Sequence, residues 1–535
     1  MAFIPSESPN IQVREIDLSG VVPAVTTSTG AFVGEFNWGP VKQPVLVGNE
    51  AELAINFGNP SIDAAANAQD FLSAAAFLKY SSNAYITRVV GTGSLNASTG
   101  TAVLVENRED FDSKTVTGII AKYPGTVGNS LAFYVADSST FSGWVDGASN
   151  PLETYFDGAP TGDEVHIAVV DSDGVISGVT GTVLETFAYV STVQGAKKDD
   201  GSTNYANDVL NNRSQYLWVK SGTALSSGGL SGGVSASPSV SDYRIGFDQY
   251  EDEDTIQVDF LVSPGLNAAD NAGLVNYMTG LAAARKDCVV VASPARDEVV
   301  GVNDTTDIVD AVVTWANSLN ASSYLIIDNN YVKVYDKYND EYVYIPAAPM
   351  TAGVMAATDD VAAPWFSPAG SRRGQYFGVT SLAYNATKSQ RDTLYKASVN
   401  PIVNLPGQGI LLYGDKTKLG RPSAFDRINV RRLFLGIERA IKGAAQNVMF
   451  EFNDEFTRAE FVNIVEPFLR EIKGRRGITD FRVVCDETNN TPSVIDANRF
   501  VASVFVKPAR SINYVTLNFV AVRTGVDFDE IVGTV

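Results

Sequence analysis

The chain has 535 residues, which is more than one hydrophobic core usually supports, so we expect about three domains. Its 45% hydrophobic and 19% charged residues are typical of a globular protein and exclude a disordered or collagen-like chain. The formal net charge of −21 argues against nucleic-acid binding, because an acidic body repels phosphate.

The first residues, MAFIPSESPN, have neither the basic flank nor the apolar core of a signal peptide. No apolar run approaches the roughly 18–20 residues that a membrane helix needs. We therefore expect a protein that is made in a cytoplasm and is not inserted into a membrane. The segment IQVREIDL (11–18) then alternates apolar and polar positions as a strand does, but it is too short to bury its own face.

Two stretches, 25–90 and 243–380, alternate strand-like segments with helical ones. This alternation predicts an α/β layer whose sheet is at least partly parallel. The simplest arrangement is one discontinuous α/β domain over 23–90 and 240–385, although two consecutive α/β domains remain an alternative. The helices expected in the second stretch lie near 269–285 and 307–319.

A β-rich insertion domain is expected between these stretches, at 91–239, and we expect it to lie on the outer surface of an assembly. Gly- and Ser-rich segments at 91–101 and 221–239 bury little apolar surface, so they are typical of linkers or domain edges. Between them, period-2 runs such as LAFYVAD and EVHIAVVDSDG are separated by Gly/Asp turns. One run contains His166, the single histidine of the chain, which we expect to be an ordinary strand or surface residue.

Candidate residues for chemistry are few. A single histidine removes most zinc and acid–base chemistry from consideration. Cys288 and Cys485 lie in apolar runs, so we expect two buried strand residues without a disulfide between them. The acidic run 250–259 lacks the ligand offsets and the glycine of a calcium loop, so it predicts solvated charge before a strand. We therefore predict no catalytic residue, no metal site and no cofactor.

The segment LPGQGILLYGDKT (405–417) is the one candidate for a phosphate-binding loop. A Walker loop needs adjacent Gly and Lys, so that the lysine at the helix start reaches the phosphates. Here Asp415 separates Gly414 from Lys416 and adds a negative charge, and turn-like residues follow in place of a helix. We predict no nucleotide binding. A nucleotide hydrolase using this loop and a carbohydrate-active β domain at 103–220 are the alternatives from the enzyme class.

The region 386–535 predicts an α+β domain. A first helix from Arg427 has an apolar face at Leu433, Ile437, Ile441, Ala444 and Val448, with Glu438 and Lys442 as an i,i+4 pair on its outside. A second helix is expected to start at Thr457, in a capping box with Glu460, and to end at Gly474, with a kink at Pro467. Strands are then expected at about 480–486, 499–507 and 511–523.

The charge is unevenly distributed. Residues 391–535 carry a net charge of +3, whereas residues 1–390 carry −24. A basic end on an acidic chain indicates contacts with an acidic protein partner or with copies of the chain itself. The alternative is that the acidic charge has no specific partner and only keeps a dense particle soluble.

Several motifs resemble one known family. They are SPNIQVREIDLSGVVPAVTTSTGAFVGEFNWGP (8–40), IPAAPMTAGVMAATD (345–359), VNPIVNLPGQG (399–409), RPSAFDRINVRRLFLGIERAIKG (421–443) and FEFNDEFTRAEFVNIVEPFLREI (450–472). In this order along the chain they resemble the sheath subunits of contractile phage tails. The resemblance implies a structural protein that is not an enzyme, with an extended sheath that shortens and drives an inner tube through the envelope of a target cell. A sheath of a genome-free, phage-derived injection particle remains an alternative.

The resemblance also implies partners and contact residues. Expected partners are further copies in rings or a helix, the tail tube protein, and the baseplate and tail terminator proteins, all in the tail of a virion assembled in the host cytoplasm. An N-terminal arm (1–22) and a C-terminal arm (521–535) would complete the sheet of a neighbouring copy. The arm residues implied are Ile11, Val13, Arg14, Ile16, Val522, Val526, Phe528 and Ile531.

In this family the C-terminal domain lies innermost, against the tube, which would give its basic surplus a partner. The residues implied as facing the tube or a neighbouring copy are Arg431, Arg432, Arg439, Lys442, Lys473, Arg475 and Arg476.

Overall fold

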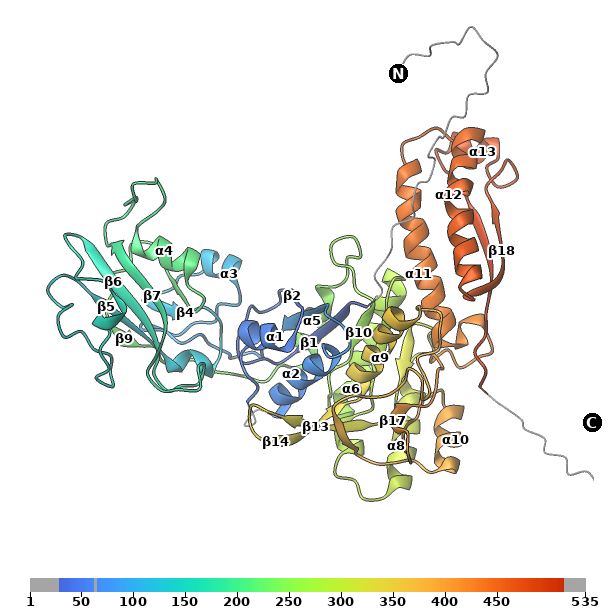
Figure 1. The fold of residues 1–535 in the computed structure, drawn as a ribbon, viewed down its shortest axis with the longest axis horizontal. Helices are drawn as coiled ribbons and strands as arrows, with labels where there is room; N and C mark the ends of the chain where they lie inside the picture. The colour runs from blue at the N-terminus through green and yellow to red at the C-terminus, as the bar shows by residue number, and fades with distance from the viewer. Residues whose placement is uncertain (1–27, 62–64, 514–535) are drawn as a thin grey trace, which may run out of the picture.

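The computed structural model describes residues 28–61 and 65–513. Figure 1 shows three bodies in a row: a β-rich unit at one end, an α/β body in the middle and an upright pair of helices at the other end. The protein is a mixed α/β molecule with several sheets, as the sequence predicts. Both arms lie outside the described residues.

The middle body is built on one six-stranded sheet, in which the three strands that follow the β-rich unit in the chain lie beside the three that precede it, with β10 next to β1. All neighbouring strands are parallel except β2, which pairs with β3 in the antiparallel direction. The strands, in order across the sheet, are β12 (Leu325–Ile327), β11 (Val289–Ala292), β10 (Phe260–Val262), β1 (Gly30–Gly34), β3 (Ala84–Arg88) and β2 (Val45–Val47). One sheet thus unites the two predicted α/β stretches, while the domain bounds themselves stay a prediction.

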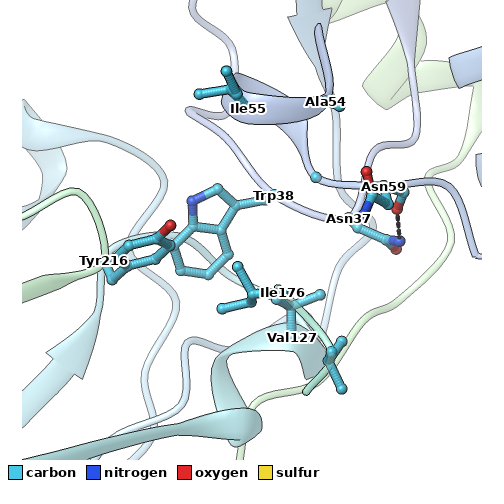
Figure 2. Close-up of a pocket in the computed structure, with 10 residues that line it drawn as sticks. Asn37, Trp38, Ala54, Ile55, Asn59, Val127, Ile176 and Tyr216 are labelled. Carbon is cyan, nitrogen blue, oxygen red and sulfur yellow. Dashed lines mark hydrogen bonds between the residues drawn. The ribbon is translucent and has the colours of Figure 1, made fainter. Parts of the chain in front are cut away.

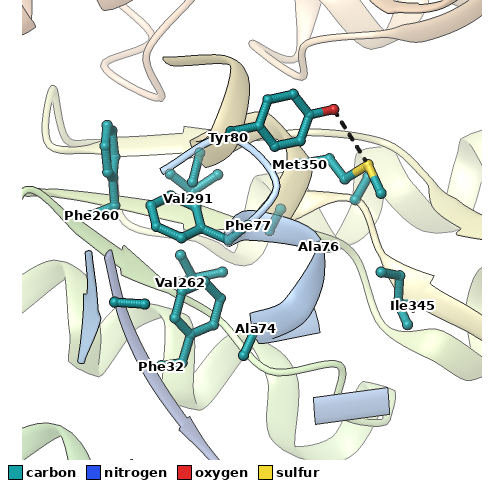
Figure 3. Close-up of a cluster of buried hydrophobic side chains, with 14 of the residues drawn as sticks. Phe32, Ala74, Ala76, Phe77, Tyr80, Phe260, Val262, Val291, Ile345 and Met350 are labelled. Atoms are coloured by element: carbon teal, nitrogen blue, oxygen red, sulfur yellow. Dashed lines mark hydrogen bonds between the residues drawn. The ribbon is translucent and has the colours of Figure 1, made fainter. Parts of the chain in front are cut away.

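The sheet is buried on both faces, which explains the continuous apolar runs of its strands. On one face, Phe32, Phe260 and Val291 pack with helices α2 (Ala65–Phe77) and α9 (Ala348–Val361) (Figure 3). Residues one position along each strand, such as Val33 and Leu261, join a second core on the opposite face. Most of the helical residues in this second core come from α5 (Val240–Asp248), α6 (Ala268–Arg285) and α8 (Thr305–Ser318).

Smaller elements surround this sheet. Helices α6 and α8 are the two that the sequence predicts near 269–285 and 307–319. The remaining elements are α1 (Glu50–Phe57), α7 (Arg296–Val299), the sheet β14 (Glu341–Pro346), β13 (Tyr331–Asp336) and β15 (Val379–Leu382), α10 (Lys388–Lys396), and the hairpin β16 (Ile402–Leu405) and β17 (Gly409–Leu412).

The β-rich unit, which we call the insertion, contains a four-stranded antiparallel sheet and a second strand pair. His166 lies on β6, fully buried: its Nε2 is 2.8 Å from the carbonyl oxygen of Gly158, and the backbone N–H of Tyr189 donates to Nδ1. The elements are α3 (Arg108–Ser113), β4 (Ile119–Ala121), β5 (Leu131–Ala136), β6 (Glu164–Asp171), β7 (Thr182–Ser191), α4 (Ala206–Arg213), β8 (Leu217–Val219) and β9 (Gly228–Gly229).

The two Gly/Ser-rich segments do not behave as loose linkers, so that part of the interpretation is wrong. Their backbones pair with each other: the N–H of Gly91 donates to the carbonyl oxygen of Ala236, and Leu95 forms a bridge with Val234. A Cβ at Gly91 would lie 2.1 Å from the carbonyl oxygen of Ser237, so only glycine permits this approach. The small residues serve a close backbone contact where the chain enters and leaves the insertion.

The C-terminal unit consists of the antiparallel helices α11 (Ile428–Ala445) and α12 (Glu455–Gly474), the short helix α13 (Pro492–Asp496), and the two strands β18 (Ile478–Val484) and β19 (Ser503–Pro508) (Figure 1). The predicted apolar face of α11 packs in the core of this unit, and Pro467 lies inside α12. The predicted capping box is wrong, because α12 starts earlier and Asp454 caps it by accepting the N–H of Thr457. Most of the third expected strand lies outside the described residues.

Candidate assembly surfaces

The four basic residues expected on α11 all form ion pairs with carboxylates of their own chain, although Lys442 stays half exposed. Arg431 and Arg432 are 5% and 4% exposed, so the expectation that they face the tube or a neighbouring copy is wrong. Arg431 stacks between Tyr324 and Phe425 and pairs with Glu438 at 3.5 Å. Long side chains on a helix can cover the surface of an adjacent domain, which helical periodicity alone does not reveal.

Arg432 joins the C-terminal unit to the α/β body. Its guanidinium donates to the carbonyl oxygen of Met355, pairs with Asp359 on α9, and lies over the ring of Phe260. Both charged side chains of this pair are less than a tenth exposed. Removal of one partner would leave a buried charge uncompensated.

The acidic run 250–259 forms the other half of the same junction. Arg439 pairs with Asp259 at 2.6 Å, and Lys442 pairs with Glu253 at 2.5 Å and Asp254 at 3.2 Å. The expected intrahelical partner of Lys442, Glu438, is instead bound to Arg431, so that predicted pair is wrong. The acidic run is not merely solvated charge before a strand, because part of it binds α11.

The remaining basic candidates lie at the C-terminal end of α12. Lys473 pairs with Asp480 at 3.0 Å, and Arg475 pairs with Glu471 at 3.5 Å while its guanidinium lies over the ring of Trp365. Arg476 is exposed. These three keep accessible charge and stay candidates for contacts with another protein.

Asp415, which breaks the Walker pattern in the sequence, is a buried anchor for the chain as it leaves the C-terminal unit. Ser511 donates to it at 2.7 Å, Asn513 at 2.8 Å, and Arg427 pairs with it at 3.0 Å. Burial alone would raise the pKa of Asp415, but these hydrogen bonds and Arg427 hold it below its ordinary value. The sequence singles this residue out only as a defect, because its partners lie about a hundred positions away.

The neighbouring lysine is occupied as well. Lys416 Nζ donates to the carbonyl oxygen of Tyr395 at 2.7 Å and lies 4.0 Å from the centre of the Tyr395 ring. Residues 409–412 form a strand, and no helix follows directly, so the segment lacks the geometry that lets a Walker lysine reach phosphates.

The sheet of the C-terminal unit consists of only two strands within residues 478–508. β18 pairs with β19 along one edge, and in the described part of the chain no further strand joins either outer edge. Both strands are largely half-buried or exposed. Open strand edges offer unpaired N–H and C=O groups to an added strand.

A second surface lies where the α/β body meets the insertion. Trp38 projects from the α/β body between Tyr216 and Ile176 of the insertion (Figure 2), and its ring centre lies 6.1 Å from that of Tyr216. An apolar pocket of about 250 Å³ surrounds it. Beside the pocket, the buried Arg88 donates to four backbone carbonyl groups from Phe36, Asn37, Gly39 and Pro124, and burial lowers its pKa to about 9. Arg88 therefore forms hydrogen bonds to both the α/β body and the insertion.

Among residues 28–61 and 65–513, no group of three or more His, Cys, Asp or Glu side chains is arranged to hold a metal ion. In those ranges no helix has the length and apolar character needed to cross a membrane. Cys288 and Cys485 are buried and unpaired, each one residue outside a strand.

Two family models match the chain. The phage tail sheath protein central domain matches residues 241–418, and the phage tail sheath C-terminal domain matches residues 421–521. The tail sheath protein of Salmonella phage ViI is 33% identical over an alignment that covers 98% of each chain.

Solved structures share the fold at low sequence identity. A sheath tail protein from Listeria innocua matches with a TM-score of 0.56 and 13% identity, over 91% of this chain and 96% of that one. The helical sheath of the anti-feeding prophage, solved in the contracted state, matches with a TM-score of 0.54 and 13% identity, over 97% and 99% of the two chains.

Proposed function

The chain belongs to the phage tail sheath family, and from that premise we propose that it polymerises around an inner tube and that shortening of the polymer drives the tube through the envelope of a target cell. The match of the whole chain to a tail sheath protein carries the proposal. The protein is a structural subunit of the phage tail. Assembly takes place in the host cytoplasm, and the tube, baseplate and terminator proteins are its further partners.

The two-stranded sheet of the C-terminal unit supports this proposal physically. Within residues 28–61 and 65–513, the outer edges of β18 and β19 are unpaired and can each accept a strand, and the segment 11–18 has the alternating sequence pattern of a strand. We propose that the N-terminal arm of one copy and the C-terminal arm (521–535) of another complete this sheet. Main-chain hydrogen bonds between copies would then survive a large change in subunit orientation.

Contraction needs no cofactor in this mechanism. The extended polymer is a kinetic trap whose free energy is stored at assembly. A preference of about 1–3 kcal/mol per subunit for the short state, a typical coupling size, adds up over many copies. The tube contact would involve the exposed Lys473, Arg475 and Arg476, since Arg431 and Arg432 are buried.

Electron microscopy of the purified full chain at high concentration tests the proposal. We expect rings or tubes, with longer tubes when the tail tube protein is added as a template. A protein that stays monomeric at every salt and protein concentration would contradict the sheath function.

The fold shared with the anti-feeding prophage sheath keeps a second candidate, a sheath of a genome-free injection particle. Isolation of the intact particle decides between the two. Packaged DNA in a capsid joined to the sheath supports the phage tail, whereas a particle without capsid and DNA supports the alternative.

A further inference from the structure

The loop between α11 and α12 carries an exposed apolar cluster. Met449, Phe450, Phe452 and Phe456 expose 59%, 101%, 83% and 74% of their surface. Large apolar side chains gathered on one exposed segment are typical of an interaction site. Phe450 also has a φ of 69°, a left-handed conformation that bulky residues rarely adopt. Exposure and backbone strain are both unfavourable in an isolated chain, so they indicate a contact made elsewhere.

The same loop is acidic. Glu451, Asp454 and Glu455 are exposed among the apolar side chains, and residues 449–456 contain no lysine or arginine. We call this segment the acidic tip. Its chemistry fits a partner surface that combines aromatic groups with positive charge.

A surface of that kind lies at the other end of α12. A groove of about 950 Å³ is lined by the apolar side chains of Trp365, Phe366, Tyr413 and Ile512, of which Ile512 is 83% exposed. We call it the basic groove, because its charged lining consists of five cations and one carboxylate, Arg372, Arg373, Lys473, Arg476, Arg510 and Asp415.

The charge of the groove is not neutralised by its own carboxylate. Asp415 is already bound to Arg427, Ser511 and Asn513 at the base of the groove. Burial, together with the positive charge of Arg372, lowers the pKa of Arg373 below its ordinary value. An acidic ligand would relieve this repulsion between like charges.

The tip and the groove of one chain cannot meet. The tip, residues 449–456, ends in the first turn of α12, whereas Lys473 and Arg476 lie at the other end of that helix. A straight helix of 20 residues is roughly 30 Å long, and Figure 1 shows α12 upright between the two sites. A contact between them therefore requires two molecules.

We propose that the acidic tip of one copy docks in the basic groove of the next copy. The proposal rests on the sheath function and assigns it a side-chain contact in addition to the strand exchange by the arms. Because the two surfaces differ, the contact is head-to-tail, and repetition of such a contact gives an open helical array or a ring. The charges across it are exposed, so added salt weakens it.

Cross-linking between two single-cysteine variants of the full chain tests the proposal. The native cysteines, Cys288 and Cys485, are buried and give little background. One variant carries Phe450→Cys in the tip, and the other carries Ile512→Cys in the groove. Under mild oxidation in the assembled state, we expect this mixture to form a disulfide-linked pair at least tenfold faster than a mixture of Phe450→Cys with Val193→Cys. Val193 is a matched control, because it is 54% exposed and lies in the insertion.

Charge reversal adds a test of specificity. Addition of Glu451→Lys to the tip variant is expected to slow cross-linking severalfold, and addition of Arg476→Glu to the groove variant is expected to restore it. Both residues are exposed, so neither change disturbs a core. If reversal of both charges does not restore the rate, the proposed charge complementarity is wrong.

The outcomes separate this contact from the sheath function. Tubes without cross-links above the Val193→Cys control would overturn the tip contact and leave the sheath function intact. Cross-links without tubes would support the contact and count against the sheath function. Rapid closure of an intrachain disulfide in a single chain with Ile512→Cys and Val526→Cys would show that the chain's own C-terminal arm fills the groove, which also overturns the proposal.

Discussion

The insertion and the C-terminal unit are attached to the same α/β body, but they differ in how far each completes its own fold. The insertion closes a four-stranded sheet over its own cores, and β6 is buried along nearly all its length. The described part of the C-terminal unit, up to residue 513, has two strands, a small core and three exposed phenylalanines where α11 and α12 are joined. We infer that the insertion is a finished domain carried by the subunit, whereas the C-terminal unit is completed by other copies.

Changes in the N-terminal arm are expected to have the largest effect on assembly. Removal of residues 1–20 is expected to leave a folded, soluble subunit, because one short strand contributes little to its own domain, but to abolish tubes. Val13→Pro is the milder form, since it deletes one ladder donor from a paired strand. Thermal unfolding of the isolated subunit and electron microscopy of assemblies measure the two effects.

A control for the arm variants is Ile4→Pro, which lies before the alternating segment 11–18 and is expected to assemble normally. Normal tubes from Val13→Pro would mean that the arm does not donate a strand.

The attachment of α11 gives the next largest effect. Arg432→Ala leaves the buried carboxylate of Asp359 without its guanidinium, so we expect a loss of about 3–5 kcal/mol in the free energy of unfolding. Denaturant titration measures this loss. Arg476→Ala is the matched control on the exposed end of α12 and should change stability by no more than about 0.5 kcal/mol. Equal effects would refute the distinction between inward and outward arginines.

Asp415→Asn tests the anchor of the C-terminal arm. Loss of the charge weakens the hydrogen bonds from Ser511 and Asn513 and the pair with Arg427, so we expect a loss of about 1.5–3 kcal/mol. Because the pKa of Asp415 in the folded chain is below its ordinary value of 3.8, its contribution is present above that pH and is lost as the pH falls through the folded pKa. The free energies of unfolding of wild type and variant should therefore become equal at acid pH. A difference between them that stays constant at every pH would count against the role of Asp415 as an anchor.

The insertion gives a small expected effect on assembly. Replacement of residues 98–231 by a short Gly/Ser turn keeps the Leu95–Val234 bridge, and Trp38→Gln removes the indole that the deletion would expose. We expect a folded subunit that still forms tubes, because the insertion closes its own sheet. Loss of tubes from a variant that remains folded would place assembly contacts in the insertion and break the comparison.

The smallest effect concerns nucleotides. Calorimetry with ATP should detect no saturable binding to wild type, and Lys416→Ala should leave that result unchanged, because Lys416 already binds the carbonyl oxygen and ring of Tyr395. Saturable binding that the substitution removes would revive the enzyme alternative.

The elements were predictable from the sequence where burial follows a simple period. Strands buried on both faces give unbroken apolar runs such as CVVVAS, and α11 and α12 show one apolar face each. The start of α12 was less predictable, because Asp454 and Thr457 are both residues that cap helices. Tertiary packing, not local pattern, decides between them.

The candidate site was predictable only in part. The sequence pattern shows where charged residues stand, but it does not show which distant residues they pair with. Arg439 pairs with Asp259, which lies 180 positions away in the sequence, and Asp415 accepts a hydrogen bond from Ser511, which lies 96 positions away. A run of basic residues on a helix fits a solvated face and a domain junction equally well. The sequence shows three phenylalanines in FEFNDEF, but it does not show that they are exposed. Their exposure depends on where α11 ends and α12 begins.

The paired entry and exit of the insertion have a consequence for the evolution of the molecule. Gly91 and Ala236 lie one hydrogen bond apart, so the chain enters and leaves the insertion through one closed stem. A folded domain whose two ends lie close together closes the stem by itself. The entropic cost of closing the stem therefore does not grow with the size of that domain. Relatives of this chain could therefore exchange the whole module for one of another size or fold while the strand order β10-β1-β3 stays the same.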